Sequence, residues 1–229
     1  MSPQIPLALK FPPDQQLAAF EGQPSLRALV GAVARGESAD WLYLAGPSAS
    51  GKTHLLLAAS VEARQHGVRA SFLPLAALSG RLAEALSGQL DSPLVCLDGL
   101  DAIAGNPSDE LALFHFHNAS RQAGNRLIYS ASAMPSALPI ALPDLASRLE
   151  QCTRLTLAPL DDEARRLVLR QRAARRGLQL DDAVLDYLLR RVGRDLATLT
   201  SLLDRLDQAS LAAQRRVTVP FLRDFLEPG

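Results

Sequence analysis

The stretch "WLYLAGPSASGKT", residues 41–53, decides the fold of this 229-residue chain. Its first half is an apolar run that predicts a buried strand ending at Gly46. Its second half, Gly46 to Thr53, fits the phosphate-loop pattern G-x-x-x-x-G-K-[ST], and we expect a helix from Thr53 to about His66. Because this motif requires a strand before it and a helix after it, the sequence predicts a nucleotide-binding α/β domain.

The residue types in this loop suit the binding of phosphate. Gly46 and Gly51 allow the backbone to turn its N–H groups toward the phosphates, and the helix that follows favours negative charge at its start. Lys52 can reach the β- and γ-phosphates, and the hydroxyl of Thr53 can ligate Mg²⁺. We expect the whole loop and the next residue to contact the nucleotide: Gly46, Pro47, Ser48, Ala49, Ser50, Gly51, Lys52, Thr53 and His54.

Strand and helix patterns alternate along the next hundred residues. This alternation predicts a mostly parallel five-stranded sheet with helices on both faces. Helical patterns cover 80–86 and 109–122. The remaining strands are expected at "VRASFLPL" (68–75), "PLVCLD" (93–98), "NRLIYSAS" (125–132) and "TRLTLAPL" (153–160).

A small helical lid domain is expected over 159–229, where the strand signals stop. Asp161 can cap a first helix that ends near Gly177, Asp181 or its neighbour starts a second, and Pro220 opens the last. The nucleotide-binding domain then covers 26–158. Residues 1–25 hold five prolines and no helical period, which predicts an extended or loop-like tail.

Composition excludes several classes of protein. Hydrophobic residues make up 48% of the chain and the formal net charge is zero, so general attraction to nucleic acid or to an anionic membrane is not indicated. No apolar run reaches the length of a membrane span and no leader is evident, so we expect a cytoplasmic protein. Cys96 and Cys152 are expected to be buried thiols, and His115 and His117 point to different sides of a helix, which argues against a metal pair.

The run "LVCLDGLD", residues 94–101, supplies the second half of the nucleotide site. Asp98 ends a buried strand and can help to hold Mg²⁺, as in other phosphate-loop proteins. Many such ATPases carry a second carboxylate at the next position, which orients the attacking water, but here that residue is Gly99. Asp101 comes two residues later and need not aim at the same point. The sequence therefore predicts nucleotide binding with little or no hydrolysis.

The order of motifs resembles the DnaA-related AAA+ family, and most closely its regulatory inactivators, Hda. The resemblance runs through "GPSASGKTH", "LVCLDGLD", "IYSASAMP", "LPDLASRLE" and "VGRDLATLTSLLDRLDQAS". It implies that Ser130 and Ser132 occupy the sensor-1 stretch, that Arg148 is an arginine finger offered to a neighbouring subunit, and that Arg194 is the sensor-2 arginine. From the residues alone, Ser130 could simply end a strand and both arginines could be solvated surface residues.

The start of the chain, "QIPLAL", resembles the short peptides by which replication proteins dock on the sliding clamp. The matching positions are Gln4, Ile5, Leu7 and Leu9. A tail that is already extended loses little entropy when it enters a groove, and its apolar side chains can serve as anchors. The alternative is a tail that packs on its own domain.

The resemblance implies an adaptor rather than an independent enzyme. It would bind ADP or ATP with Mg²⁺, dock on the DNA polymerase III β sliding clamp, and present Arg148 to ATP held by DnaA, which prevents re-initiation. Contact with DNA would run mainly through the clamp, because we expect no helix-turn-helix domain like the one that follows the lid of DnaA. The alternatives are an autonomous AAA+ ATPase, such as a helicase-loader relative, and a small-molecule kinase. The sequence leaves self-association and the working nucleotide open.

Overall fold

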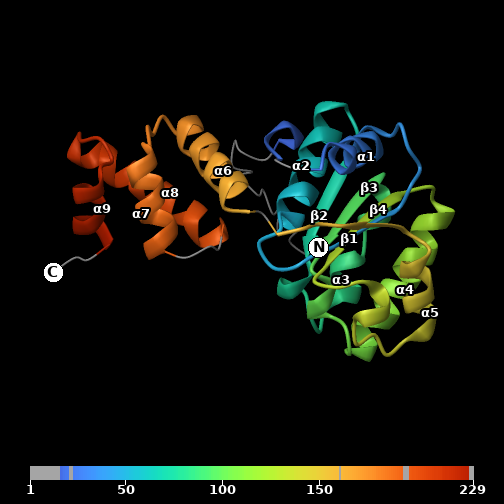
Figure 1. The fold of residues 1–229 in the computed structure, drawn as a ribbon. Helices are drawn as coiled ribbons and strands as arrows, with labels where there is room; N and C mark the ends of the chain where they lie inside the picture. Colours follow the sequence, from blue (N-terminus) through green and yellow to red (C-terminus); the bar gives the residue numbers. More distant parts are fainter. Residues whose placement is uncertain (1–15, 21–22, 160, 193–195, 227–229) are drawn as a thin grey trace, which may run out of the picture.

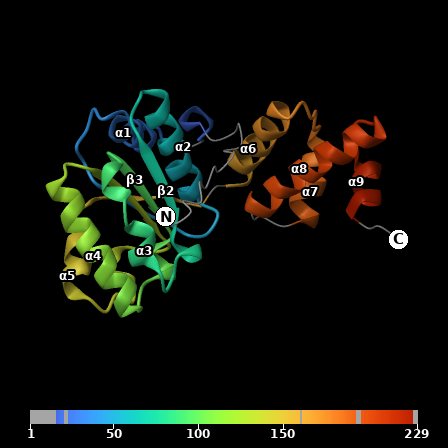
Figure 2. The same ribbon diagram turned by 180° about the vertical axis from the view of Figure 1, so that it is seen from behind.

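The computed structural model describes residues 16–20, 23–159, 161–192 and 196–226. These residues form a sheet domain and a group of helices that follows it in the chain. Figure 1 shows the two parts side by side, and Figure 2 shows the same arrangement from behind.

The sheet has five parallel strands in the order β2-β3-β4-β1-β5. Its strands are β1 (Leu42–Ala45), β2 (Ala70–Pro74), β3 (Leu94–Asp98), β4 (Arg126–Ala131) and β5 (Thr153–Thr156). The last residue of β1, Ala45, lies opposite Ala131 of β4 and Thr156 of β5. Because all strands run in one direction, the segments that follow them meet at the same edge of the sheet.

Helices cover both faces of the sheet, as the continuous apolar strands require. Alternate residues of β1 serve the two faces: Leu42 and Leu44 belong to one hydrophobic core, and Tyr43 and Ala45 belong to the other. The first core is closed by α1 (Pro24–Arg35) and α2 (Lys52–Gln65). The second is closed by α3 (Leu82–Leu86), α4 (Pro107–Gln122) and α5 (Pro143–Glu150), which lie on the opposite face in Figure 1.

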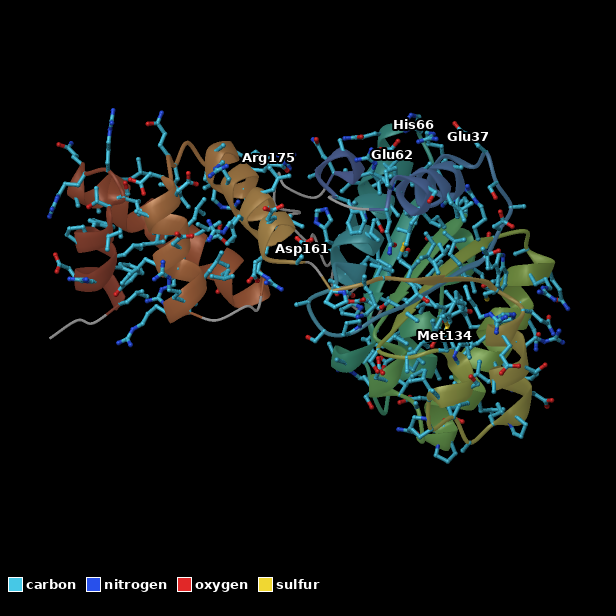
Figure 3. The ribbon with its side chains drawn as sticks, in the orientation of Figure 1. Glu37, Glu62, His66, Met134, Asp161 and Arg175 are labelled. Atoms are coloured by element: carbon cyan, nitrogen blue, oxygen red, sulfur yellow. The ribbon has the colours of Figure 1, made fainter. Side chains whose placement is uncertain are left out.

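The second part of the chain is helical and has its own core. Its helices are α6 (Asp162–Arg175), α7 (Asp182–Arg191), α8 (Leu196–Ala213) and α9 (Val219–Leu226). The side chain of Asp161 accepts the N–H of Ala164 at 2.7 Å, so it caps α6, and Arg175 lies at the other end of this helix (Figure 3). Leucines, valines and phenylalanines of all four helices form one apolar cluster.

Most elements expected from the sequence are confirmed. All five strands, the helix after the phosphate loop, the caps Asp161 and Asp181, and the four helices of the C-terminal part are present. The helices α1 and α5 were not assigned from the sequence. Within the described residues, the tail expected to be extended or loop-like over 1–25 contains a 3-10 turn, η1 (Leu17–Ala19), and it is wrong at its end, because α1 already begins at Pro24.

The two cysteines are buried thiols, as expected from the sequence. Cys96 and Cys152 are free, and burial raises the pKa of each thiol to about 12. Among the described residues, no group of three or more His, Cys, Asp or Glu side chains could hold a metal ion. Within the same residues, no helix has the length and apolar character needed to cross a membrane.

His117 is a buried histidine between α4 and the sheet. Its Nδ1 lies 3.0 Å from the hydroxyl of Tyr129, and its ring meets the edge of Trp41 with ring centroids 4.5 Å apart. Burial lowers the pKa of His117 from 6.5 to about 4, and the positive charges of Arg121 and Arg148 act in the same direction. The imidazole is therefore neutral in the folded protein at neutral pH.

We expect the free energy of unfolding to fall as the pH drops from about 6.5 to about 4. In this window the unfolded chain protonates His117 and the folded chain does not, so the proton stabilises the unfolded state. The full effect at pH 4 is about 3 kcal/mol for one histidine. His117→Gln should flatten this pH dependence in denaturant titrations. His115→Gln, at an exposed position of the same helix, should leave it unchanged. A His117→Gln variant with the wild-type pH dependence would contradict the assignment.

Candidate nucleotide-binding site

The loop between β1 and α2 is closely packed and strongly turned. The N–H of Gly46 donates to the carbonyl of Ala131 at 3.2 Å, and a Cβ at Gly46 would lie only 2.6 Å from the carbonyl oxygen of Leu157. Ala49 and Gly51 adopt positive φ angles of 61° and 94°. Glycine is required at Gly46 by contact and at Gly51 by conformation, which agrees with the chemistry expected of a phosphate loop.

Lys52 stands at the first position of α2 and turns back over the loop. Its Nζ donates to the carbonyl oxygens of Gly46 at 2.5 Å and Pro47 at 2.7 Å, and it lies 3.4 Å from Oγ of Ser50. Burial lowers the pKa of Lys52, while the carboxylates of Asp101 and Asp98 oppose that shift. The ammonium is thus held inside the loop, where the oxygens of a bound phosphate could replace the carbonyls as acceptors.

Asp98 links the phosphate loop to the end of β4. Its Oδ2 accepts the hydroxyl of Thr53 at 2.8 Å, and its Oδ1 accepts the hydroxyl of Ser130 at 2.5 Å. The oxygen of Ser130 in turn accepts the N–H of Gly99 at 2.9 Å. Ser130 is fully buried. The structure therefore places Ser130 as a support that orients Asp98, and not on the open side of the loop.

The oxygens of Thr53 and Asp98 form a donor set that fits Mg²⁺. A hydroxyl and a carboxylate oxygen 2.8 Å apart are both hard ligands, which Mg²⁺ prefers. Asp98 is the last residue of β3, and Thr53 lies in the first turn of α2, next to Lys52. These residues could hold a metal ion together with phosphate oxygens.

Asp101 and Ser132 make a second link between the same strand ends. The carboxylate of Asp101 accepts the N–H of Ser132 at 2.9 and 3.1 Å, and it also accepts the Ser132 hydroxyl. Gly99, with φ 82°, starts the 3-10 turn η4 (Leu100–Ala102) that turns Asp101 toward β4. This pairing was not expected from the sequence. β4 separates β3, which precedes Asp101, from β1, which precedes Lys52. The pairing with Ser132 explains how Asp101 still acts on the pKa of Lys52.

Phe20 forms an apolar support beneath the loop that the sequence did not reveal. Its ring stacks on His54 with centroids 6.3 Å apart and an interplanar angle of 18°. A Cβ at Gly51 would lie 2.9 Å from Cε2 of Phe20, so ring and loop are in close contact. The signal in the sequence is weak, because Leu17 and Phe20 are two isolated apolar residues in a proline-rich stretch.

The proposed finger Arg148 lies on α5, away from the loop of its own chain. The residue is half-buried, and within residues 23–159 its guanidinium makes no hydrogen bond or ion pair. Its backbone carbonyl accepts the thiol of Cys152 at 3.8 Å. Arg194 and the tail residues Gln4, Ile5, Leu7 and Leu9 lie outside the described residues.

The C-terminal helices match a known protein family. Residues 162–226 match the family model described as Hda, lid domain. This match covers all four helices of the C-terminal part of the chain.

Solved structures share the fold over most of the chain. Domain III of the Thermotoga maritima replication initiation protein DnaA superposes with a TM-score of 0.76 at 18% identity, and the match covers 93% of this chain and 95% of that one. DnaA from Aquifex aeolicus, bound to AMPPCP, gives 0.66 at 22% identity, with 85% and 65% covered. The RuvB branch-migration motor of Thermotoga maritima gives 0.63 at 18% identity, with 90% and 69% covered. The chain thus spans about two thirds of the length of the longer relatives.

The strand order, the phosphate loop and the helical domain that follows define an AAA+ fold. Residues 162–226 thus resemble the lid of Hda, and the fold over most of the chain is that of DnaA.

We expect Lys52→Ala to reduce the affinity for ADP and ATP by at least about a hundredfold, which corresponds to about 2.7 kcal/mol. The reason is that the ammonium is the cation held within the loop. Isothermal calorimetry measures both affinities. The matched control is Lys10→Ala, because Lys10 is the only other lysine of the chain and lies outside the loop. Equal affinities for wild type and Lys52→Ala would show that the loop does not bind nucleotide.

Proposed function

We propose that this protein is a nucleotide-bound AAA+ adaptor that stimulates the hydrolysis of ATP held by DnaA and thereby prevents re-initiation of replication. The observation that carries the proposal is the match of residues 162–226 to the lid of Hda, on a chain whose whole fold is DnaA-like. The AMPPCP bound to DnaA in the Aquifex aeolicus structure supports adenine nucleotide as the ligand class.

ADP or ATP would bind at the loop Gly46–Thr53. Lys52 would donate to phosphate oxygens, and the N–H groups of the loop would face them. Thr53 and Asp98 would hold Mg²⁺, which neutralises phosphate charge when bound. His54 and Phe20 would form the apolar side of the site, and Arg194 is proposed to approach the phosphates from the lid.

Little intrinsic hydrolysis is proposed for the protein alone. Gly99 has no side chain with which to orient a water molecule. The carboxylate of Asp101 already accepts the N–H and the hydroxyl of Ser132, so its oxygens are directed toward that residue and not toward a water molecule. Bound nucleotide would then serve to fix the structure of the adaptor and not to drive a cycle of its own.

The alternative is an autonomous AAA+ ATPase. One observation favours it: the Asp101 carboxylate lies close enough to the phosphate loop to act on the pKa of Lys52. If Asp101 replaces the missing second carboxylate, the isolated protein hydrolyses ATP and Asp101→Asn abolishes that activity. The adaptor proposal expects little or no ATP hydrolysis by the isolated protein, with or without the Asp101→Asn change.

Arg148 is proposed to act at the nucleotide of DnaA. A half-buried guanidinium that makes no hydrogen bond within residues 23–159 is available to a partner, and its planar fork suits the oxygens of a phosphate. An arginine supplied in trans meets the charge that develops on the transferring phosphoryl group, and such fingers accelerate hydrolysis by about 10³ to 10⁵. One side chain could therefore switch the state of the initiator.

The tail would bring the adaptor to its place of action. Gln4, Ile5, Leu7 and Leu9 are proposed to bind the DNA polymerase III β sliding clamp, so that DNA is contacted mainly through the clamp. The protein would be cytoplasmic and associated with the nucleoid only in this way. Self-association is compatible with the proposal but is not required by it.

We expect Arg148→Ala to abolish the stimulation of DnaA-bound ATP hydrolysis, a loss of about 10³-fold or more if the finger has the usual strength. The assay uses DnaA charged with ATP, clamp-loaded DNA and the full chain. Nucleotide affinity and melting temperature should stay near wild type, because the guanidinium makes no hydrogen bond or ion pair within residues 23–159. Arg148→Lys should restore little activity, since a point charge does not reproduce the fork.

The matched control for Arg148 is Arg154→Ala, an exposed arginine on β5 of the same domain. It should keep full stimulation. The adaptor without DnaA provides the background, which should be close to zero. Full stimulation by Arg148→Ala would end the proposed mechanism, and a fall in melting temperature along with activity would mark Arg148 as structural.

We expect the triple change Gln4→Ala, Leu7→Ala and Leu9→Ala to remove binding to immobilised clamp, because the apolar anchors and the glutamine are the parts that resemble a clamp-docking peptide. Nucleotide affinity should not change, since the two functions reside on separate segments. Lys10→Ala, just beyond the peptide, is the control. If the triple variant binds the clamp as well as wild type does, the tail is not a clamp-docking peptide. The alternative, a tail that packs on its own domain, would then hold.

A further inference from the structure

Glu110 is a fully buried carboxylate near the start of α4 that points out of its own helix. Its Oε1 accepts the N–H of Gly105 at 2.6 Å and the N–H of Ala141 at 3.0 Å. Its Oε2 accepts the N–H of Leu142 at 2.7 Å. Within the described residues it forms no ion pair, so backbone donors alone compensate its burial. A buried carboxylate is costly, and three charge-assisted hydrogen bonds offset that cost.

The two segments that Glu110 joins follow different strands of the sheet and lie far apart in the sequence. Gly105 lies just beyond η4, the turn that follows Asp98 and carries Asp101 at the nucleotide site. Ala141 and Leu142 lead into α5, and Leu142 is the N-cap residue of that helix. One carboxylate therefore bridges the segment after β3 to the segment that starts the helix of Arg148. In the sequence these segments are more than thirty residues apart.

The start of α5 depends on this bridge. The N-cap residue of α5, Leu142, makes no side-chain hydrogen bond to the helix, because leucine has no acceptor. Pro143 follows it at the first helical position. Leu145 and Leu149 of the helix are buried in the core, and Leu142 packs against it. Cys152 in the same core and β5, which begins at Thr153, hold the C-terminal end of α5, whereas Glu110 holds the segment at its N-terminal end.

A change in the direction of α5 at its start also alters the placement of Arg148. The arginine lies six positions after Leu142, about 9 Å along the helix axis. A tilt of about 10° over this length displaces the two positions by more than 1 Å relative to each other, and the long side chain of Arg148 turns with the helix axis. Misplacement of a catalytic group by about 1 Å can lower a rate by about 10²-fold.

We propose that Glu110 is a positioning residue that fixes the helix of Arg148 relative to the segment after Asp98. The inference rests on the proposed role of Arg148 as the arginine finger. It goes further than that role, because it assigns control of the finger's geometry to a buried side chain. That side chain belongs neither to the nucleotide loop nor to the finger. The linkage also gives the segment after Asp98 a direct physical connection to α5.

The chain supplies a matched control in the neighbouring residue. Asp109 is also buried, on the same turn of α4, and also accepts two backbone N–H groups: Gly80 at 2.6 Å and Leu82 at 3.2 Å. These donors belong to the start of α3, and Asp109 accepts no hydrogen bond from Gly105 or from the start of α5 within the described residues. Removal of either carboxylate leaves buried N–H groups without acceptors, so both changes should lower stability. Only one of them should affect Arg148.

The experiment compares Glu110→Gln with Asp109→Asn in the full chain. A glutamine keeps the shape but turns an amide N–H₂ toward backbone donors. Both variants are measured for melting temperature, nucleotide affinity and the maximal rate of DnaA-bound ATP hydrolysis at saturating adaptor on clamp-loaded DNA. We expect both melting temperatures to fall, but the maximal rate to drop by about tenfold to a hundredfold only for Glu110→Gln. Asp109→Asn should stay within about twofold.

Two further comparisons separate this inference from the proposed function. In the background of Arg148→Ala, Glu110→Gln should cause no additional loss, because both changes remove the same contribution. If Arg148→Ala itself keeps full stimulation, the proposed function of Arg148 is wrong, and the inference about Glu110 fails with it. If Arg148→Ala abolishes stimulation but Glu110→Gln and Asp109→Asn behave alike, the positioning role of Glu110 is wrong. If Glu110→Gln does not fold, Glu110→Asp takes its place, and the same two outcomes apply.

Discussion

The parallel pairing of β1 with β4 is the constraint on which the rest of the site depends. It sets Ala45 opposite Ala131, and Gly46 then donates its N–H to that same residue. Because β3 lies on the other side of β4, the carboxylate of Asp98 comes within hydrogen-bond distance of both Thr53 and Ser130. A slip of one residue in this register would exchange the two faces of β1 and separate the loop from its acidic partner.

Backbone donors and buried acceptors organise the other half of the sheet domain. Asp109 and Glu110 stand next to each other at the start of α4, and each reaches out to a different neighbour. Apolar packing alone fixes how far α3 and α5 lie from α4, but it is not directional. Hydrogen bonds to loop N–H groups are directional, and they cost much if one partner is lost. The two carboxylates therefore define the orientation of segments that the hydrophobic core only holds in place.

The parts of the site that the sequence predicted are those encoded in one short stretch. Lys52 and Thr53 belong to a contiguous motif whose neighbours define its context, and Asp98 ends a strand that its apolar pattern reveals. Ser130 was expected at the end of a strand near the phosphates, but its contact with Asp98 was not foreseen. The pairing of Asp101 with Ser132 joins positions 31 residues apart, and the packing of Phe20 beneath Gly51 follows no periodic pattern. Such contacts depend on strand order, which hydrophobic periodicity does not encode.

By itself, the sequence determined the alternation of strands and helices, the phosphate loop and the caps of the lid helices. These are local properties: backbone freedom at glycine, capping by Asp161 and Asp181, and the period of apolar residues. The tertiary structure decided which strand ends meet, which oxygen Ser130 bonds, and that one buried carboxylate joins Gly105 to the start of α5. These contacts form only when distant segments are packed, because their energies come from burial and from directional bonds that no single segment contains.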